Sequence, residues 1–281
     1  VVSLPSTTAT VTFTGGSLSE LDFETLINNL SYENYSDDPS TTSRVVTITS
    51  ITDNGGTGGA NDDTNDALSI TSTVGITATN DAPVLSGTAT FDTIDEDATG
   101  NTGTLITDLI TSFGANYDEI DSGDPKGFAV VGVVETNGTW EYTVDGSTWS
   151  SLTGVLPTNA VLLADDGNNA IRFIPNGDYN GNTGNTVSLK AWDQTTGNDE
   201  DTGADVSTNG GTTAYSAGTG TASITVDPIN DEPSFTVIGN PTANTSSEGL
   251  VTVASFVATI DLGPPDEDIA SGAPTEQAVS S

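Results

Sequence analysis

Cysteine, methionine and histidine are all absent from this chain of 281 residues. Without them there can be no disulfide bond, no thiolate nucleophile, no imidazole base and none of the usual nitrogen or sulfur ligands of zinc and haem. The ligands that remain are oxygen atoms, which suit hard cations such as Ca²⁺. Any metal site in this chain is therefore expected to bind a hard cation.

Positive charge is almost as scarce. The chain has 4 Lys and Arg residues against 40 Asp and Glu residues, which gives a formal net charge of −36. So acidic a surface repels nucleic acid and anionic membranes, and it also repels itself. We therefore expect bound cations, with Ca²⁺ as the cofactor, and no nucleic-acid partner.

Long apolar runs are missing as well. No stretch approaches the ~18 apolar residues of a membrane-spanning helix, so no membrane insertion is expected. High charge with few hydrophobic residues is also typical of disordered chains. Here, however, short runs rich in β-branched and aromatic residues alternate apolar and polar positions. That pattern predicts strands, at residues 9–14, 44–52, 68–79, 127–134, 139–144, 170–175, 186–192 and 221–226.

One segment has the period of a helix instead. In residues 19–30, Ser19 and Asp22 form the sequence pattern of a capping box, and apolar residues follow at helical spacing. The sequence therefore predicts a short helix there. Residues 104–113 fit a helix or a strand equally well, because periodicity does not distinguish the two in so short an apolar run.

The chain also repeats itself. TNDAPVL at 79–85 recurs as INDEPSF at 229–235, so that Asn80 and Asn230 lie 150 residues apart. Residues 28–53 align with 168–193, and 117–123 align with 265–272. A fixed period of this kind is the signature of a tandem array of domains.

The repeat defines three parts of the chain. Residues 83–232 form one complete repeat, 1–82 match only its second part, and 233–281 match only its first part. Two explanations fit. Either the chain is a segment of a longer polypeptide with many repeats, or separate copies complete one another's split domain by donor-strand assembly. Both predict a fibre in which the partners are adjacent repeats or copies of the chain itself, joined head to tail.

The acidic residues gather between the strands, as the ligands of Ca²⁺ do in flexible loops. At the first junction we expect Asn80 and Asp81 to meet Asp95 to Asp97 and the loop from Asp53 to Asp66. The second junction should repeat this arrangement with the linker at Asn230 and the loop from Asp193 to Asp201. The candidate metal ligands are Asp53, Asp62, Asp63, Asn80, Asp81, Asp95, Glu96, Asp97, Asp118, Glu119, Asp121, Asp193, Asp199, Asp201, Asp227, Asn230, Asp231, Glu248, Asp266, Glu267 and Asp268.

These junctions resemble those of the cadherin-like and bacterial Ig-like tandem repeats in giant secreted, RTX-type bacterial surface adhesins. The segments WEYTVDGSTWSSL (140–152), IRFIPNGDYNGN (171–182) and LKAWDQTTG (189–197) are similar to a repeat of the same proteins. The resemblance implies Greek-key β-sandwiches with calcium-binding junctions, an extracellular or cell-surface location, and a role in adhesion or a biofilm matrix. One departure is that no acidic residue lies two positions before Asn80.

Other interpretations of the same residues remain open. The acidic loops could serve only solvation or adaptation to high salt, and neither an EF-hand loop nor a complete glycine-rich calcium nonapeptide is present. The three tryptophans, Trp140, Trp149 and Trp192, are expected in the core rather than on a sugar-binding platform. We expect a structural protein and no enzyme. The alternatives are a module that binds surface glycans and, third, a polysaccharide-active enzyme.

Overall fold

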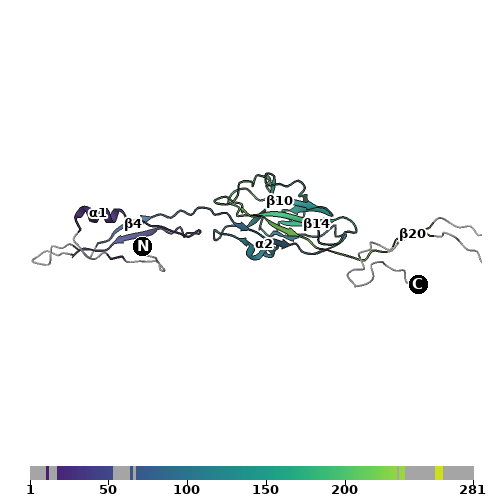
Figure 1. Ribbon diagram of the computed structural model, residues 1–281, viewed down its shortest axis with the longest axis horizontal. Coiled ribbons are helices and arrows are strands. Elements are labelled where there is room, and N and C mark those ends of the chain that lie inside the picture. The colour runs from purple at the N-terminus through teal and green to yellow at the C-terminus, as the bar shows by residue number, and fades with distance from the viewer. Residues whose placement is uncertain are drawn as a thin grey trace, which may run out of the picture. The chain divides into compact units, whose positions relative to one another are not determined.

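The computed structural model describes residues 11–12, 18–52, 64–65, 68–232, 234–237 and 257–261 (Figure 1). Contacts divide the chain into two units, Val1–Ala78 and Thr79–Ser281. The boundary places the linker residues Asn80 and Asp81 with the domain that follows them. Each unit is described by itself, and the strand predicted at 9–14 lies mostly outside the described residues.

The first unit contains the predicted helix and two strand pairs. Helix α1 (Glu20–Asn28) begins at Ser19, whose hydroxyl accepts a hydrogen bond from the Asp22 amide while the Asp22 carboxylate accepts one from the Ser19 amide. The capping box is thus confirmed. Strand β1 (Arg44–Ile48) pairs antiparallel with β4 (Ile70–Val74), and β2 (Ile51–Thr52) pairs with β3 (Thr64–Asn65).

Residues 79–232 form an all-β sandwich of two sheets (Figure 1). The larger sheet has six strands, in the order β16 (Thr202–Ala204), β13 (Ala160–Ala164), β10 (Gly127–Glu135), β15 (Asn185–Trp192), β17 (Gly220–Ser223) and β6 (Thr88–Thr90). The smaller sheet has four, in the order β12 (Ser150–Ser151), β11 (Gly138–Thr143), β14 (Ala170–Pro175) and β8 (Thr104–Leu105). The strands predicted within this range are therefore confirmed.

The core lies between the sheets. Phe128 and Leu189 from the larger sheet and Trp140 and Phe173 from the smaller one belong to a single buried cluster. Trp192 is buried in a second cluster on the opposite face of the larger sheet. Burying side chains of this size is the main favourable term in folding. The prediction that Trp140 and Trp192 are core residues is confirmed.

Trp149 differs from the other two tryptophans. It is only half-buried, and the guanidinium of Arg172 lies 4.0 Å from its ring centroid. Arg172 also donates to the Glu141 carboxylate from Nη2 at 2.6 Å and from Nε at 2.8 Å. The cation therefore covers one face of this ring and joins β14 to β11.

The ambiguous segment at 104–113 contains both kinds of structure. It begins as strand β8 and continues as helix α2 (Ile106–Phe113), with Ile106, Leu109 and Phe113 buried on its inner face. The packing of these three side chains against the core favours the helix over a strand. A short 3₁₀ turn (Gly114–Asn116) and strand β9 (Tyr117–Asp118) follow, and β9 pairs with β5 (Val84–Leu85).

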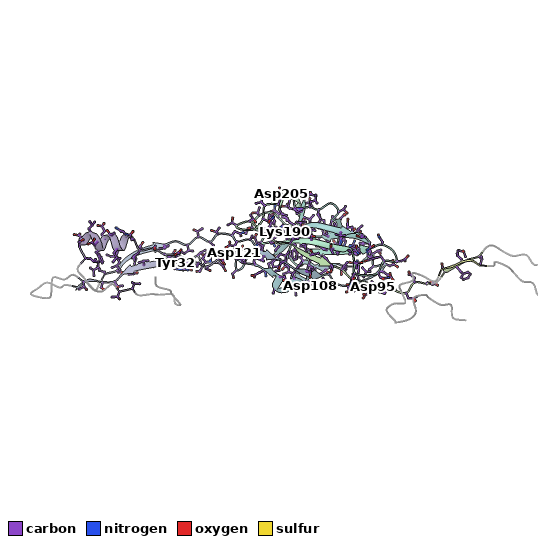
Figure 2. The ribbon with its side chains drawn as sticks, in the orientation of Figure 1. Tyr32, Asp95, Asp108, Asp121, Lys190 and Asp205 are labelled. Atoms are coloured by element: carbon purple, nitrogen blue, oxygen red, sulfur yellow. The ribbon has the colours of Figure 1, made fainter. Side chains whose placement is uncertain are left out.

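The last two strands of the domain run parallel to two strands near its start. Strand β6 pairs with β17, and β7 (Ile94–Asp95) pairs with β18 (Val226–Asp227). The chain therefore enters the domain at one end and leaves it at the other. Figure 2 shows Asp121 and Asp95 at these opposite ends. Beyond the exit, β19 (Ser234–Val237) pairs with β20 (Val257–Asp261).

The strand pair of the first unit has a counterpart in the domain. Val46 lies opposite Ser72 in the β1–β4 pair, and Val187 lies opposite Ala222 in the β15–β17 pair, with Ser72 and Ala222 150 residues apart. The gap-free alignment of 28–53 with 168–193 would have placed Thr47, not Val46, at the position of Val187. The strand register thus differs from that alignment by one residue. In the structure it is Val46, an apolar residue, and not the polar Thr47, that corresponds to Val187.

Candidate cation sites at the two poles of the domain

The N-terminal pole of the domain is where the linker Asn80–Asp81 meets the end of β15. Asn80 donates from Nδ2 to Asp193 Oδ2 at 2.9 Å and to the Thr213 carbonyl at 3.3 Å. The Asp81 amide donates to Asp121 Oδ2 at 2.7 Å. These bonds hold the linker against two acidic side chains of the domain that follows it.

Asp193 at this pole is a fully buried carboxylate, with an exposed fraction of 0%. Its Oδ1 accepts from the amide and the hydroxyl of Thr195, at 2.8 and 2.6 Å. All of its hydrogen-bond donors, Asn80 included, are uncharged. Neutral donors satisfy the oxygens, but they do not supply an opposite charge to the buried carboxylate.

Glu119 lies beside this charge. Both of its carboxylate oxygens are buried and have no hydrogen-bond partner. The pKa of Glu119 is raised to about 7, first by its loss of solvent on burial and then by the negative charges of Asp193 and Asp124. Among the described residues, the other buried side-chain atom without a partner is Asn169 Oδ1. The N-terminal pole therefore gathers several carboxylates around the two Glu119 oxygens, which have no hydrogen-bond partner among the described residues.

The C-terminal pole is organised by Glu96, which is 2% exposed. Its Oε1 accepts from the Ile229 amide at 2.6 Å and its Oε2 from Asn180 Nδ2 at 3.2 Å. The backbone amide of Glu96 donates to the Asp227 carbonyl at 2.9 Å. The carboxylate of Glu96 thus fixes the segment by which the chain leaves the domain.

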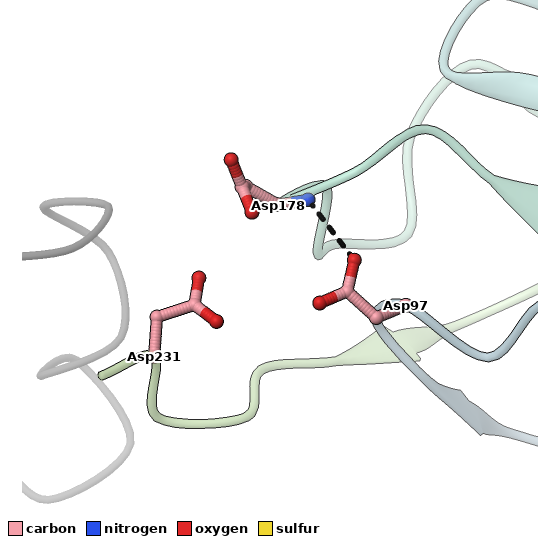
Figure 3. Close-up of side chains that lie close together, drawn as sticks. All are labelled: Asp97, Asp178 and Asp231. Atoms are coloured by element: carbon pink, nitrogen blue, oxygen red, sulfur yellow. Dashed lines mark hydrogen bonds between the residues drawn. The ribbon is translucent and has the colours of Figure 1, made fainter.

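Three further carboxylates converge beside Glu96 (Figure 3). Asp97, Asp178 and Asp231 come from three separate segments, and each offers an oxygen within 4.8 Å of the others. The Asp178 amide donates to Asp97 Oδ1 at 3.5 Å. Asp97 and Asp178 both have positive φ, 61° and 59°, which is uncommon outside glycine. This carboxylate triad has the donor set of a hard-cation site.

The grouping of residues differs from the expected one. Asp95 to Asp97 do not join Asn80 and Asp81, because β7 runs parallel to β18 and ends at the C-terminal pole with the second linker. Asp193 does not join Asn230, because β15 runs antiparallel to β17 and ends at the N-terminal pole. Both corrections have one cause. The order of strands along the chain does not reveal at which end of a sandwich each strand finishes.

The remaining candidates are dispersed. Asp199 Oδ1 accepts from the Ala164 amide and from Asn169, each at 2.7 Å, so it connects its loop to the end of β13. Asp201 Oδ2 accepts from the Asn198 amide at 2.8 Å and stabilises its own loop. Asp95, Asp118, Asp227 and Asn230 are exposed at the poles. The candidates that lie outside the described residues are Asp53, Asp62, Asp63, Glu248, Asp266, Glu267 and Asp268.

Sequence reasoning missed three polar residues of the poles. Asp178 and Asn180 lie in the loop NGDYNGN after β14, and Asp124 lies after the DEID run. The first two lie in a loop rich in turn residues, but only the strand pairing shows that the end of β14 reaches the C-terminal pole. Nothing in the local sequence of Asp124 marks it apart from its acidic neighbours.

Comparison with known proteins adds no family assignment. No protein-family model matches the chain, and no curated protein or solved structure matches it. Among the described residues, no helix is long and apolar enough to cross a membrane.

Proposed function

We propose that this chain is an extracellular structural repeat of a surface adhesin, biofilm-matrix fibre or sheath, and that Ca²⁺ bound at the poles of its domain stiffens it. The proposal combines the repeat in the sequence, the β-sandwich between two linkers, and the net charge of −36. Such a chain needs cations in order to pack domains in series, because its acidic surfaces otherwise repel one another.

The buried carboxylate of Glu119 is the observation that carries the proposal. Two unpartnered oxygens beside the buried charge of Asp193 are unfavourable in the absence of a cation, because a carboxylate removed from water needs hydrogen bonds or an opposite charge in compensation. The donor set fits a hard cation because it consists of oxygen alone. Calcium fits better than magnesium, which requires near-octahedral geometry and keeps much of its water.

Each pole offers its own set of ligands. At the N-terminal pole no three carboxylates of the described residues converge within 4.8 Å, so a cation there would bind beside Glu119 with fewer side-chain ligands. Asn80 and Asp81 donate to the neighbouring carboxylates of Asp193 and Asp121. The cation would neutralise charge and hold the linker against the domain. At the C-terminal pole the carboxylate triad, Asp97, Asp178 and Asp231, would play the same part. Asp231 belongs to the second linker, so the C-terminal site also joins a linker to the domain.

The test is the thermal unfolding of the complete chain in Ca²⁺, in Mg²⁺ and in a chelator. A ligand that binds only the folded state at about 100 times its dissociation constant contributes about 2.7 kcal/mol, which raises Tm by about 5–10 °C in a domain of this size. We expect that shift in Ca²⁺ and a smaller one in Mg²⁺. Small-angle scattering under the same conditions should show a longer maximum dimension in Ca²⁺.

An unchanged Tm together with an unchanged scattering dimension would contradict the proposal. The competing role, an adhesin module that binds glycans through its loops, would then be favoured by retention of the isolated chain on immobilised polysaccharide without a calcium requirement.

A further inference from the structure

The first and last segments of the domain are joined by a continuous line of hydrogen bonds, which we call the terminal seam. It comprises residues 85–96 of the first segment and 218–229 of the last. Its backbone bonds run from the Thr221 amide to the Gly87 carbonyl (3.1 Å), Phe91 to Ser223 (2.9 Å), Ile94 to Thr225 (3.2 Å) and Glu96 to Asp227 (2.9 Å). Both segments advance in the same direction along this line, as the parallel pairing of β6 with β17 and β7 with β18 requires.

A side chain extends the seam past its last backbone bond. Glu96, almost completely buried, accepts a hydrogen bond from the Ile229 amide at 2.6 Å. A bond from a backbone amide to a charged carboxylate is stronger than one between neutral groups. The seam therefore ends, at the C-terminal pole, in its strongest contact.

Close backbone packing begins the seam at the other pole. A Cβ atom on Gly218 would lie 2.1 Å from the Leu85 carbonyl oxygen, and one on Gly220 would lie 2.6 Å from the Phe113 ring and 3.0 Å from the Leu85 side chain. Only glycine allows the two segments to approach so closely. Ala89 and Ala222, which face each other across the seam, are both buried.

The direction of the seam decides how it responds to tension. The chain enters at the N-terminal pole and leaves at the C-terminal pole, so a force applied through the linkers pulls the two segments in opposite directions along the seam. All of its bonds are then loaded together in shear. A force that separated the same strands from one end would instead break the bonds one after another.

We propose that the terminal seam is a mechanical clamp that lets the domain transmit tension along the chain without unfolding. The inference deepens the proposed structural function and rests on it, because only a chain that bears tension between its neighbours uses this property. It assigns Glu96 a positioning role, which is to hold the exit segment in the seam, in addition to any part in cation binding. The clamp consists of protein contacts alone.

Single-molecule force spectroscopy on the complete chain tests the clamp. Because the chain has no cysteine, pulling handles can be attached specifically to any pair of cysteines introduced by substitution. One variant carries Thr79→Cys and Glu232→Cys, so that force passes through the linkers. The other carries Ser86→Cys and Thr219→Cys, exposed positions at the start of β6 and β17, so that force peels the seam from one end.

The clamp predicts a direction-dependent unfolding force. Forced unfolding is governed by the barrier along the pulled direction, and we expect the linker direction to require at least about twice the force of the peeling direction. Equal forces, or a lower force in the linker direction, would overturn the proposal. Both variants keep the native core, so poor folding cannot explain a difference between them.

Two glycine variants can be compared with each other when force is applied through the linkers. Gly218→Ala inserts a methyl group into the seam, and Gly138→Ala inserts one 2.3 Å from the Ile174 carbonyl in the β11–β14 pair, outside the seam. Both should lower Tm, but only Gly218→Ala should lower the unfolding force. An unchanged force in Gly218→Ala would also overturn the clamp.

Repeating the measurement in Ca²⁺ and in chelator separates the two proposals. If Tm does not respond to Ca²⁺ while the force still depends on direction, the cation role fails and the clamp stands. If Ca²⁺ raises Tm but the two directions unfold at equal force, the clamp fails and the cation role stands.

Discussion

The side-chain amide of Asn80 donates a hydrogen bond at 2.9 Å to the fully buried carboxylate of Asp193, 113 residues further along the chain. Asn80, which precedes the first strand of the domain, thus reaches into the polar centre of the N-terminal pole. This contact makes the linker part of the folded domain rather than a free tether. It also explains why the compact unit begins at Thr79, before the first strand.

Removing the Asn80 amide should destabilise the domain. Asn80→Ala leaves Asp193 Oδ2 without its linker donor, and an unsatisfied buried acceptor costs about 1–3 kcal/mol. Urea unfolding of the complete chain in chelator, followed by tryptophan fluorescence, measures the loss. Asn209→Ala is the matched control, because Asn209 donates only to the loop carbonyls of Val206 and Ser207. An Asn80→Ala midpoint equal to that of the unaltered chain would refute the role of this contact.

Neutralising Glu119 should have opposite effects with and without calcium. In chelator, Glu119→Gln removes a buried charge that faces Asp193, so the variant should unfold at a higher urea concentration than the unaltered chain. In Ca²⁺ the variant loses a charged ligand, and its calcium affinity, measured by calorimetry, should fall by at least about tenfold. Asp108→Asn, which removes one exposed charge on α2, should change neither quantity. A loss of stability in chelator would show that Glu119 is not an uncompensated charge.

The raised pKa of Glu119 predicts how stability varies with pH in chelator. The folded carboxyl binds its proton up to a pH of about 7, whereas the unfolded one releases it near the ordinary value of 4.5. Between these two values the folded state holds more protons than the unfolded state, so stability should decrease as the pH rises from 4.5 to about 7. Urea midpoints across this range measure the effect.

The same series in Glu119→Gln isolates the contribution of this residue. Hydrogen bonds from neighbouring amides and hydroxyls lower the pKa of Asp145 and of Asp205. These groups act in the opposite sense, and only at more acidic pH, where they lose their charge. The difference between the two chains should therefore appear above pH 4.5, and a constant difference from pH 4.5 to 8 would contradict the assignment.

Arg172 should resist replacement by lysine. Its guanidinium donates twice to Glu141, once to the Asn101 carbonyl, and stacks on Trp149. Lysine keeps the charge but cannot reproduce the planar fork or the stacking. We expect Arg172→Lys to lose about 1–3 kcal/mol of unfolding free energy. Lys126→Arg, which keeps a cation over the Tyr117 ring, should lose far less, and equal losses would mean that charge alone matters at Arg172.

Local patterns in the sequence were sufficient for several elements. The capping box at Ser19 and Asp22 predicted α1, and alternation predicted β10, β11, β14 and β15. In these segments each residue's neighbours along the chain favour the same structure as its tertiary contacts. Residues 104–113 were ambiguous because their helix depends on packing of Phe113 and its neighbours against the core, which no local pattern records.

The sequence by itself determined which residues carry the charge, which chemistry they allow, and that the domain is built from strands between two similar linkers. These properties depend on residue type, spacing and alternation. Only the tertiary structure decided which acidic residues meet. Parallel pairing of β7 with β18 carries Asp97 to the second linker, while the antiparallel run of β15 carries Asp193 back to Asn80. Strand direction within a sheet is a long-range property, and it sets which loops share a pole.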